Sequence, residues 1–178
     1  TVTVWAVPEH VELLSNAVAV SGQAVYFMEQ FTGVDFALPK MDLVAMPGAG
    51  GAMENWGLLR MDETSFLVND LTEGVHEKAD SASITCHEIA HQWFGDLVTM
   101  EWWDNLWLNE SFANFIENIP IHSMHPDWGI WMDYASTWSL MALRRDAIEG
   151  VQPVQTTVNH PDEIGSLFDG AIVYGKGG

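Results

Sequence analysis

The chain has 178 residues, of which 48% are hydrophobic and 17% are charged, so its composition excludes a disordered chain and allows one domain with a sizeable core. Six basic residues against twenty-five acidic ones give a formal net charge of -19, which argues against nucleic acid or an anionic membrane surface as a partner. The single cysteine excludes an intrachain disulfide, and no apolar run is long enough to span a bilayer.

The N-terminal part of the chain predicts two strands and one helix. Residues 1–7 alternate like a strand, and residues 9–31 have the apolar spacing of a helix that Gly33 closes. Residues 41–46 predict a second strand, which Pro47 ends. These elements contain no repeat or linker, so we expect one compact unit.

A glycine-rich segment follows and ends in Gly50-Gly51-Ala52, which lets another backbone approach closely. Residues 57–61 then predict a short strand, and an extended peptide could add to the edge of that strand. Taken alone, the segment is better explained by an ordinary tight turn, with Glu54 as a solvated surface acid.

A helix predicted over residues 77–94 carries His87-Glu88-Ile89-Ala90-His91. The i, i+4 spacing puts both histidines on one helix face, where they can reach a single metal ion. The same pattern also occurs by chance in unrelated helices. Cys86 points about 100 degrees away from its neighbour around a helix, so we interpret it as a small buried hydrophobic residue and not as a ligand.

The following segment offers a third ligand. Asp104 predicts the start of a helix as its N-cap, Glu110 lies in that helix, and Pro120 should lie just beyond its end. Because metal-bound imidazoles donate their other N–H to a carboxylate or carbonyl, Glu117 is a candidate partner for one histidine. Glu117 is almost as well explained as a solvent-facing helix acid.

Two histidines and one carboxylate suit a catalytic zinc ion. They leave a fourth position open for water, the metal lowers the pKa of that water, and Glu88 would take its proton as general base. The metzincin pattern is excluded, because it requires glycine and histidine where this chain has Phe94 and Leu97.

The C-terminal part predicts more helix. Pro126-Asp127 predicts the start of a helix that runs toward residues 144–145, and Pro161 begins a short helix before Tyr174. Taken alone, Tyr174 is explained by packing beside Phe168, with its hydroxyl at the surface.

Residues 51–55 read GAMEN, which is a motif of the M1 zinc aminopeptidases, and the zinc-site pattern follows at the expected place. The chain therefore resembles this family of gluzincin peptidases, and nearly its whole length takes part. The sequence is most similar to the family's members from lactic acid bacteria in three segments: residues 107–112 (WLNESF), 125–128 (HPDW) and 167–174 (LFDGAIVY).

The resemblance implies roles for particular residues. One Zn²⁺ would be bound by His87, His91 and Glu110, with Glu88 as general base. Tyr174, in a segment similar to the family's YxKG pattern, would stabilise the developing oxyanion. The substrate's N-terminal ammonium would pair with Glu54, and the substrate would contact the whole motif: Gly51, Ala52, Met53, Glu54 and Asn55.

The resemblance also implies the fold. We expect an α+β, thermolysin-like catalytic domain, in which a small sheet is followed by helices that carry the zinc site. Residues 1–178 would form this single domain. Family members surround it with an N-terminal β domain and a C-terminal helical domain, neither of which this sequence contains, so we expect a fragment.

The implied function is a zinc-dependent aminopeptidase. It would release single amino acids, with broad specificity, from peptides that have a free N-terminus, and it would act in the cytoplasm. Three alternatives stay open: a thermolysin-type endopeptidase with the same ligands, the epoxide-hydrolysing branch of the family, and a truncated, non-catalytic module that binds zinc or peptide without turnover. Cobalt or manganese could occupy the same ligand set.

Overall fold

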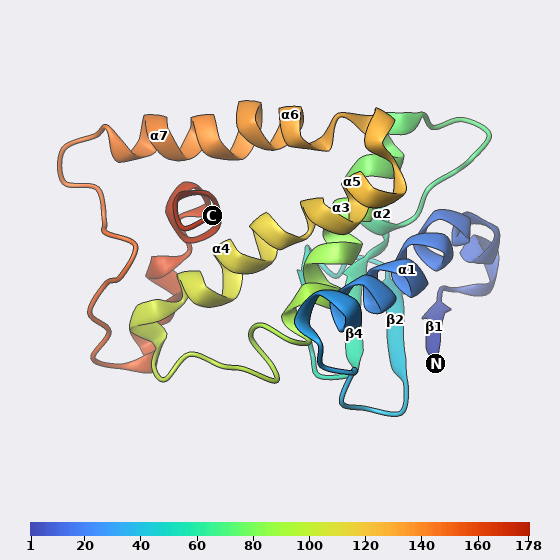
Figure 1. Cartoon of the computed structure of the whole chain (residues 1–178), viewed down its shortest axis with the longest axis horizontal. Coiled ribbons are helices and arrows are strands. Elements are labelled where there is room, and N and C mark those ends of the chain that lie inside the picture. The colour runs from blue at the N-terminus through green and yellow to red at the C-terminus, as the bar shows by residue number, and fades with distance from the viewer.

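The computed structural model describes residues 1–178 and contains a four-stranded sheet followed by helices (Figure 1). The strands lie in the order β1-β2-β4-β3. Three of them run parallel, and the short β3 pairs antiparallel with β4. The predicted α+β class is confirmed. The bounds of the strands are β1 Val2–Trp5, β2 Met41–Met46, β3 Ala52–Met53 and β4 Leu58–Asp62.

Helix α1 (Ser15–Thr32) connects the parallel strands β1 and β2, which need such a crossover. It begins later than predicted, because Pro8–Leu13 forms a tighter 3₁₀ turn before it. Its end is as predicted: Gly33 adopts the left-handed conformation (φ 69°), and its N–H donates to the carbonyl of Glu29.

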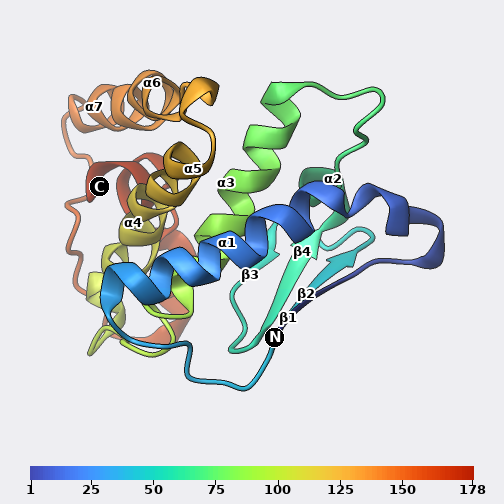
Figure 2. The ribbon, with the colours of Figure 1, turned by 45° about the vertical axis from the view of Figure 1, so that its right-hand side comes forward.

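The larger core lies between the sheet and two helices, α1 and α3 (Val75–His91), which pack against each other. Figure 2 shows α1 crossing in front of the strands, with α3 beside it. Side chains that alternate along the central strands β2 and β4 face this core and are fully buried, namely Met41, Leu43, Leu59 and Met61. The sheet thus provides the support on which α3 is held.

Helix α3 ends at His91, three residues before the predicted end at Phe94. The chain turns there: Gly95 has a φ of 132°, and Phe94 forms an isolated bridge with Val98. A short helix, α2 (Glu63–Phe66), precedes α3.

The predicted helix that carries Glu110 is α4 (Trp107–Ile116). The prediction that Asp104 is its N-cap was wrong. Asp104 lies in a separate 3₁₀ turn, and its carboxylate accepts hydrogen bonds from the side chains of Asn105 and Gln155 (3.0 and 3.2 Å). Pro120 does lie beyond α4, but within the first turn of α5 (Asn118–Met124), where its missing N–H costs nothing.

The predicted helix from residue 126 is interrupted at its start. Gly129 (φ 70°) separates a 3₁₀ turn from α6 (Ile130–Tyr134), which continues through a π-helical turn, Ala135–Ser139, into α7 (Leu140–Asp146). None of the helices is both long enough and apolar enough to cross a membrane.

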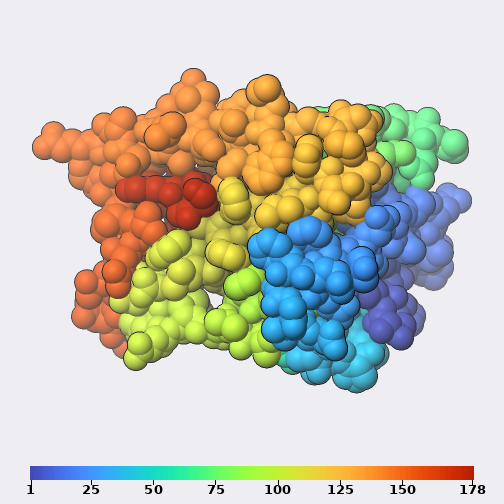
Figure 3. Space-filling view, in the orientation of Figure 1, coloured from blue at the N-terminus to red at the C-terminus, as the bar shows by residue number.

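The C-terminal segment consists of a 3₁₀ turn, Pro161–Leu167, and a π-helical segment, Gly170–Lys176. The latter packs against both α4 and α7, and Figure 3 shows the end of the chain seated between them. Tyr174 is therefore held next to the helix that carries Glu110.

The packing of α3 gives a first prediction. Replacing the fully buried Ile89 with alanine should lower the free energy of unfolding by about 2–5 kcal/mol, because the core would lose apolar contacts and gain a cavity. Urea denaturation measures this change. The control is Leu71→Ala, at a side chain that is 94% exposed, which should change stability by less than about 0.5 kcal/mol. Equal effects of the two substitutions would contradict the packing described for α3.

Candidate active site

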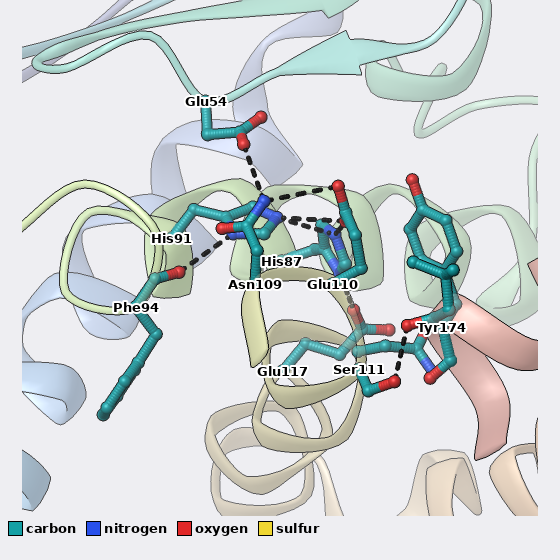
Figure 4. A network of polar contacts seen from close by, with 11 residues as sticks. Glu54, His87, His91, Phe94, Asn109, Glu110, Ser111, Glu117 and Tyr174 are labelled. Carbon is teal, nitrogen blue, oxygen red and sulfur yellow. Dashed lines mark hydrogen bonds and ion pairs between the residues drawn. The ribbon is translucent and has the colours of Figure 1, made fainter. Parts of the chain in front are cut away.

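Three potential metal ligands converge between α3 and α4 (Figure 4). The Nε2 atoms of His87 and His91 lie 3.0 Å apart. The Oε2 atom of Glu110 lies 3.4 Å from the first and 3.5 Å from the second. The histidines come from successive turns at the end of α3, and Glu110 comes from the first turn of α4. Cys86 lies in the core and is not part of this group.

The spacing of these atoms fits a zinc ion. Zinc ligands at about 2.0–2.2 Å in tetrahedral geometry lie about 3.3–3.5 Å from one another. The other nitrogen of each ring already faces an acceptor: His87 Nδ1 lies 2.7 Å from Glu117 Oε2, and His91 Nδ1 lies 3.1 Å from the carbonyl oxygen of Phe94. These contacts favour the tautomer with a free Nε2 lone pair, which is the form that binds a metal.

The charges around this group are strongly coupled. Burial lowers the pKa of His87, but its hydrogen bonds to Glu110 and Glu117 outweigh burial and raise that pKa well above the usual value. Burial raises the pKa of Glu110, but its contacts with the two histidines outweigh burial and lower it to about 2. The carboxylate of Glu110 therefore stays ionised at neutral pH, and a cation that binds the imidazoles competes with protons for their nitrogen atoms.

Glu88 lies beside the ligands without joining them. Its side chain is buried, it lines the same cleft, and its Oε2 has no hydrogen-bond partner. Burial raises the pKa of this carboxyl to about 7, a tendency that the neighbouring Glu54 and Glu110 increase and the histidines oppose. A carboxylate in this state is suited to exchange a proton near neutral pH.

Glu54 follows directly after β3 and faces the ligands from the sheet side (Figure 4). Its Oε1 accepts a hydrogen bond from Asn109 Nδ2 (3.1 Å). Most of the GAMEN segment lines the cleft, whereas Asn55 is exposed outside the lining and its carbonyl accepts from the N–H of Leu58.

The sheet edge next to the cleft differs from the prediction. Strand β4 pairs with β2 on one side and with β3 on the other, so it has no free edge for a peptide. The open edge belongs to β3, within the GAMEN segment itself. An extended peptide that added a strand here would run directly beside Glu54.

In Figure 4, Tyr174 and Glu54 lie on different sides of the ligand group. Its ring stacks on His87 and on Trp138, with centroids 6.0 and 6.1 Å apart, and it lines the cleft. Ser111, which follows Glu110, donates a hydrogen bond to the carbonyl of Val173 and so ties the Tyr174 segment to α4. Burial and the nearby Glu110 carboxylate raise the pKa of Tyr174, so the phenol stays protonated at neutral pH.

All these groups open into one cleft of about 1190 Å³. Seven carboxylates line it, and no lysine or arginine does: Glu54, Asp80, Glu88, Asp96, Glu110, Glu117 and Asp133. This lining suits a cationic group on a ligand.

Two buried amides that contact Glu54 were missed by the sequence reasoning. Asn109 donates to Glu54, and Gln92 donates to the carbonyl of Glu54 (2.8 Å) and to Asp96 (2.8 Å). Their only signal in the sequence was position, because Gln92 directly follows the potential ligand His91 and Asn109 directly precedes Glu110.

Comparison with known proteins identifies the family. The model of the peptidase family M1 domain matches residues 16–178. The chain is 46% identical over 165 residues to aminopeptidase N of Lactobacillus helveticus, covering 92% of the chain and 20% of that protein. It is 46% identical to aminopeptidase N of Lactobacillus delbrueckii subsp. lactis (98% and 21%) and 41% identical to probable aminopeptidase 2 of Sulfurisphaera tokodaii (99% and 22%). The chain thus spans about a fifth of the length of these relatives.

The contact between Glu117 and His87 gives a second prediction. Glu117→Gln should weaken zinc binding about 10- to 100-fold, because the neutral amide orients and polarises the imidazole less than a carboxylate does. Competition with a zinc-chelating dye measures the affinity. Glu149→Gln removes the same charge at an exposed position and should leave the affinity unchanged. A similar loss in both variants would mean that net charge, and not the hydrogen bond, supports the metal.

Proposed function

Because the chain belongs to peptidase family M1, we propose that it is the zinc-dependent catalytic part of an aminopeptidase. It would hydrolyse the N-terminal peptide bond of peptides with a free amine and release single amino acids with broad specificity. Residues 1–178 would form one catalytic domain that holds one zinc ion and works in the cytoplasm. The high negative charge speaks against nucleic acid as a partner.

The observation that carries this proposal is the position of Glu54. An endopeptidase with the same His, His and Glu ligands needs no fixed anion beside them. Here a carboxylate lies at the end of the open strand β3 and is joined through Asn109 to the helix of Glu110. The α-ammonium of a substrate would pair with Glu54, so that its first peptide bond lies at the metal ligands.

The metal ligands and Glu88 would carry out the proposed hydrolysis. When bound by His87, His91 and Glu110, zinc would act as a Lewis acid toward the carbonyl and lower the pKa of water. Glu88 would take a proton from the attacking water as the new C–O bond forms. It would then give that proton to the leaving nitrogen as the C–N bond breaks.

Tyr174 would stabilise the transition state. Its neutral phenol would donate a hydrogen bond to the carbonyl oxygen as that oxygen gains negative charge. The raised pKa supports this role, because the hydroxyl proton stays available at the pH at which Glu88 acts as a base.

Replacement of the proposed general base tests the chemistry. Glu88→Gln should lower kcat for alanyl anilide about 10²- to 10⁴-fold while zinc stays bound, because the amide cannot accept the proton. The measurement is release of the aniline by the zinc-supplemented chain, with zinc content determined on the same sample. Glu12→Gln, at an exposed position, is the control. Near-normal kcat in Glu88→Gln would assign the base to another group.

Glu54→Gln tests the ammonium site. The substitution keeps the shape and an acceptor for Asn109 but removes the charge, so kcat/KM for free alanyl anilide should fall about 10- to 100-fold. Hydrolysis of N-acetylalanyl anilide, already slow, should change little. Wild-type cleavage of the acetylated substrate at the rate of the free one would instead favour the endopeptidase alternative.

A further inference from the structure

A single buried amide joins the two functional ends of the cleft. Asn109 Nδ2 lies 3.1 Å from Glu54 Oε1 and 3.4 Å from Glu110 Oε1 (Figure 4). Glu110 directs its other oxygen, Oε2, toward the histidines. Asn109 thus contacts the carboxylate oxygen that the metal-ligand group leaves free, and it does so from a side chain that is only 8% exposed.

The backbone of the Glu54 segment is held from the other ligand helix. Gln92, which follows His91 and is 1% exposed, donates from Nε2 to the carbonyl of Glu54 (2.8 Å). Its Oε1 accepts from the N–H of Gly57 (2.8 Å). Because the backbone is fixed by this amide, the carboxylate of Glu54 has only its own side-chain rotations left, and the bond from Asn109 restricts those.

The turn at Gly95 leaves just enough room for this arrangement. A Cβ atom built at Gly95 would lie 2.0 Å from Asn109 Oδ1 and 3.2 Å from His91 Nδ1. Asn109 Oδ1 is buried and has no hydrogen-bond partner. The amide is therefore oriented by its two carboxylate contacts, and not by an interaction of its oxygen.

The distance between Glu54 and Glu110, which Asn109 bridges, affects which peptide bond of a substrate can be attacked. One residue of an extended peptide spans about 3.3–3.6 Å, so the offset between the ammonium site and the metal decides which peptide bond is attacked. An error of about 1 Å can cost a factor of 10² in rate, and a larger error moves the second bond into reach.

We propose that Asn109 is a positioning residue that holds the Glu54 carboxylate at a fixed offset from the metal ligand Glu110 and thereby confines cleavage to the first peptide bond. This inference rests on the proposed function of Glu54. Asn109 is not one of the three potential metal ligands. It acts through the two carboxylates on either side of it.

The test compares Asn109→Ala with Asn105→Ala, which removes a nearby amide that contacts Asp104 and has no link to Glu54. Two anilides of the same size are used: alanyl anilide, and propionyl anilide, which lacks the amine. Asn109→Ala should lower kcat/KM for alanyl anilide about tenfold or more and leave that for propionyl anilide unaffected. On a pentapeptide, mass spectrometry should detect released dipeptide, which wild type and Asn105→Ala should not produce.

Binding supplies a readout that does not depend on turnover. Calorimetry on the zinc-loaded chain compares alaninamide with propionamide, and wild type should prefer the amine about tenfold or more. Asn109→Ala should lose most of that preference. If wild type shows no preference, the role of Glu54 fails, and this inference fails with it. If wild type discriminates and Asn109→Ala discriminates equally, with single residues as its only products, the positioning role alone is overturned.

Zinc content and circular dichroism of each variant show whether a loss of activity comes from loss of bound metal or of folded structure. If Asn109→Ala unfolds, Asn109→Leu, which keeps the volume of the side chain, replaces it in the same measurements. Loss of bound zinc in both variants would assign Asn109 to the stability of the metal group and overturn the positioning role.

Discussion

Three buried carboxylates surround two imidazoles in this chain, and this excess of negative charge is the constraint on which the arrangement of the site depends. Glu88, Glu110 and Glu117 are each no more than 6% exposed. Burying an uncompensated carboxylate costs several kcal/mol, and protonated histidines compensate only part of the charge. A divalent cation between His87, His91 and Glu110 would supply what is missing. The carboxylates therefore fit a metal site better than a purely structural ion-pair network.

The fold meets this constraint by bringing the charges together on rigid elements. α3 rests on the sheet and α1, and it presents both histidines from its last two turns. Glu110 in the first turn of α4 and Glu117 at its C-cap lie about two turns apart. Glu110 faces Nε2 of His87, and Glu117 faces Nδ1 of the same ring. The C-terminal segment is tied to the same helix through Ser111. Displacement of α4 would thus disturb Glu110, the carboxylate of Glu117 that contacts His87, and Tyr174 together.

The local part of this arrangement could be predicted from the sequence, because it depends on helical periodicity. The spacing of His87 and His91 determines their common face in any helix. The sequence also suggested Glu117 as a partner of one of the two histidines, and in the structure its Oε2 lies 2.7 Å from His87 Nδ1. Features that depend on tertiary packing were not predictable in the same way. Asp104 has the chemistry of an N-cap but finds its partners in Asn105 and Gln155, and the α4 helix begins without a side-chain cap.

The pairing of the strands could not be predicted from the sequence either. The residues after the GAMEN segment predicted a strand, but only the structure shows that β4 is enclosed and that β3 keeps the open edge. Gln92 and Asn109 were overlooked for a related reason. The sequence does not indicate which partner a polar residue beside a potential metal ligand will contact. Gln92 contacts Glu54 across 38 positions of the chain, and Asn109 contacts it across 55.

The choice of amides around Glu54 has a consequence for binding. A lysine or arginine would hold a carboxylate more strongly than Asn109 does, but it would also neutralise the charge. Asn109 and Gln92 fix the side chain and the backbone of Glu54 with neutral donors, and no basic side chain lines the cleft. The negative charge of Glu54 is therefore held in place and still unpaired when a ligand enters. A free ammonium gains the full ion pair with a preorganised partner, whereas a blocked amine carries no charge and cannot form that ion pair.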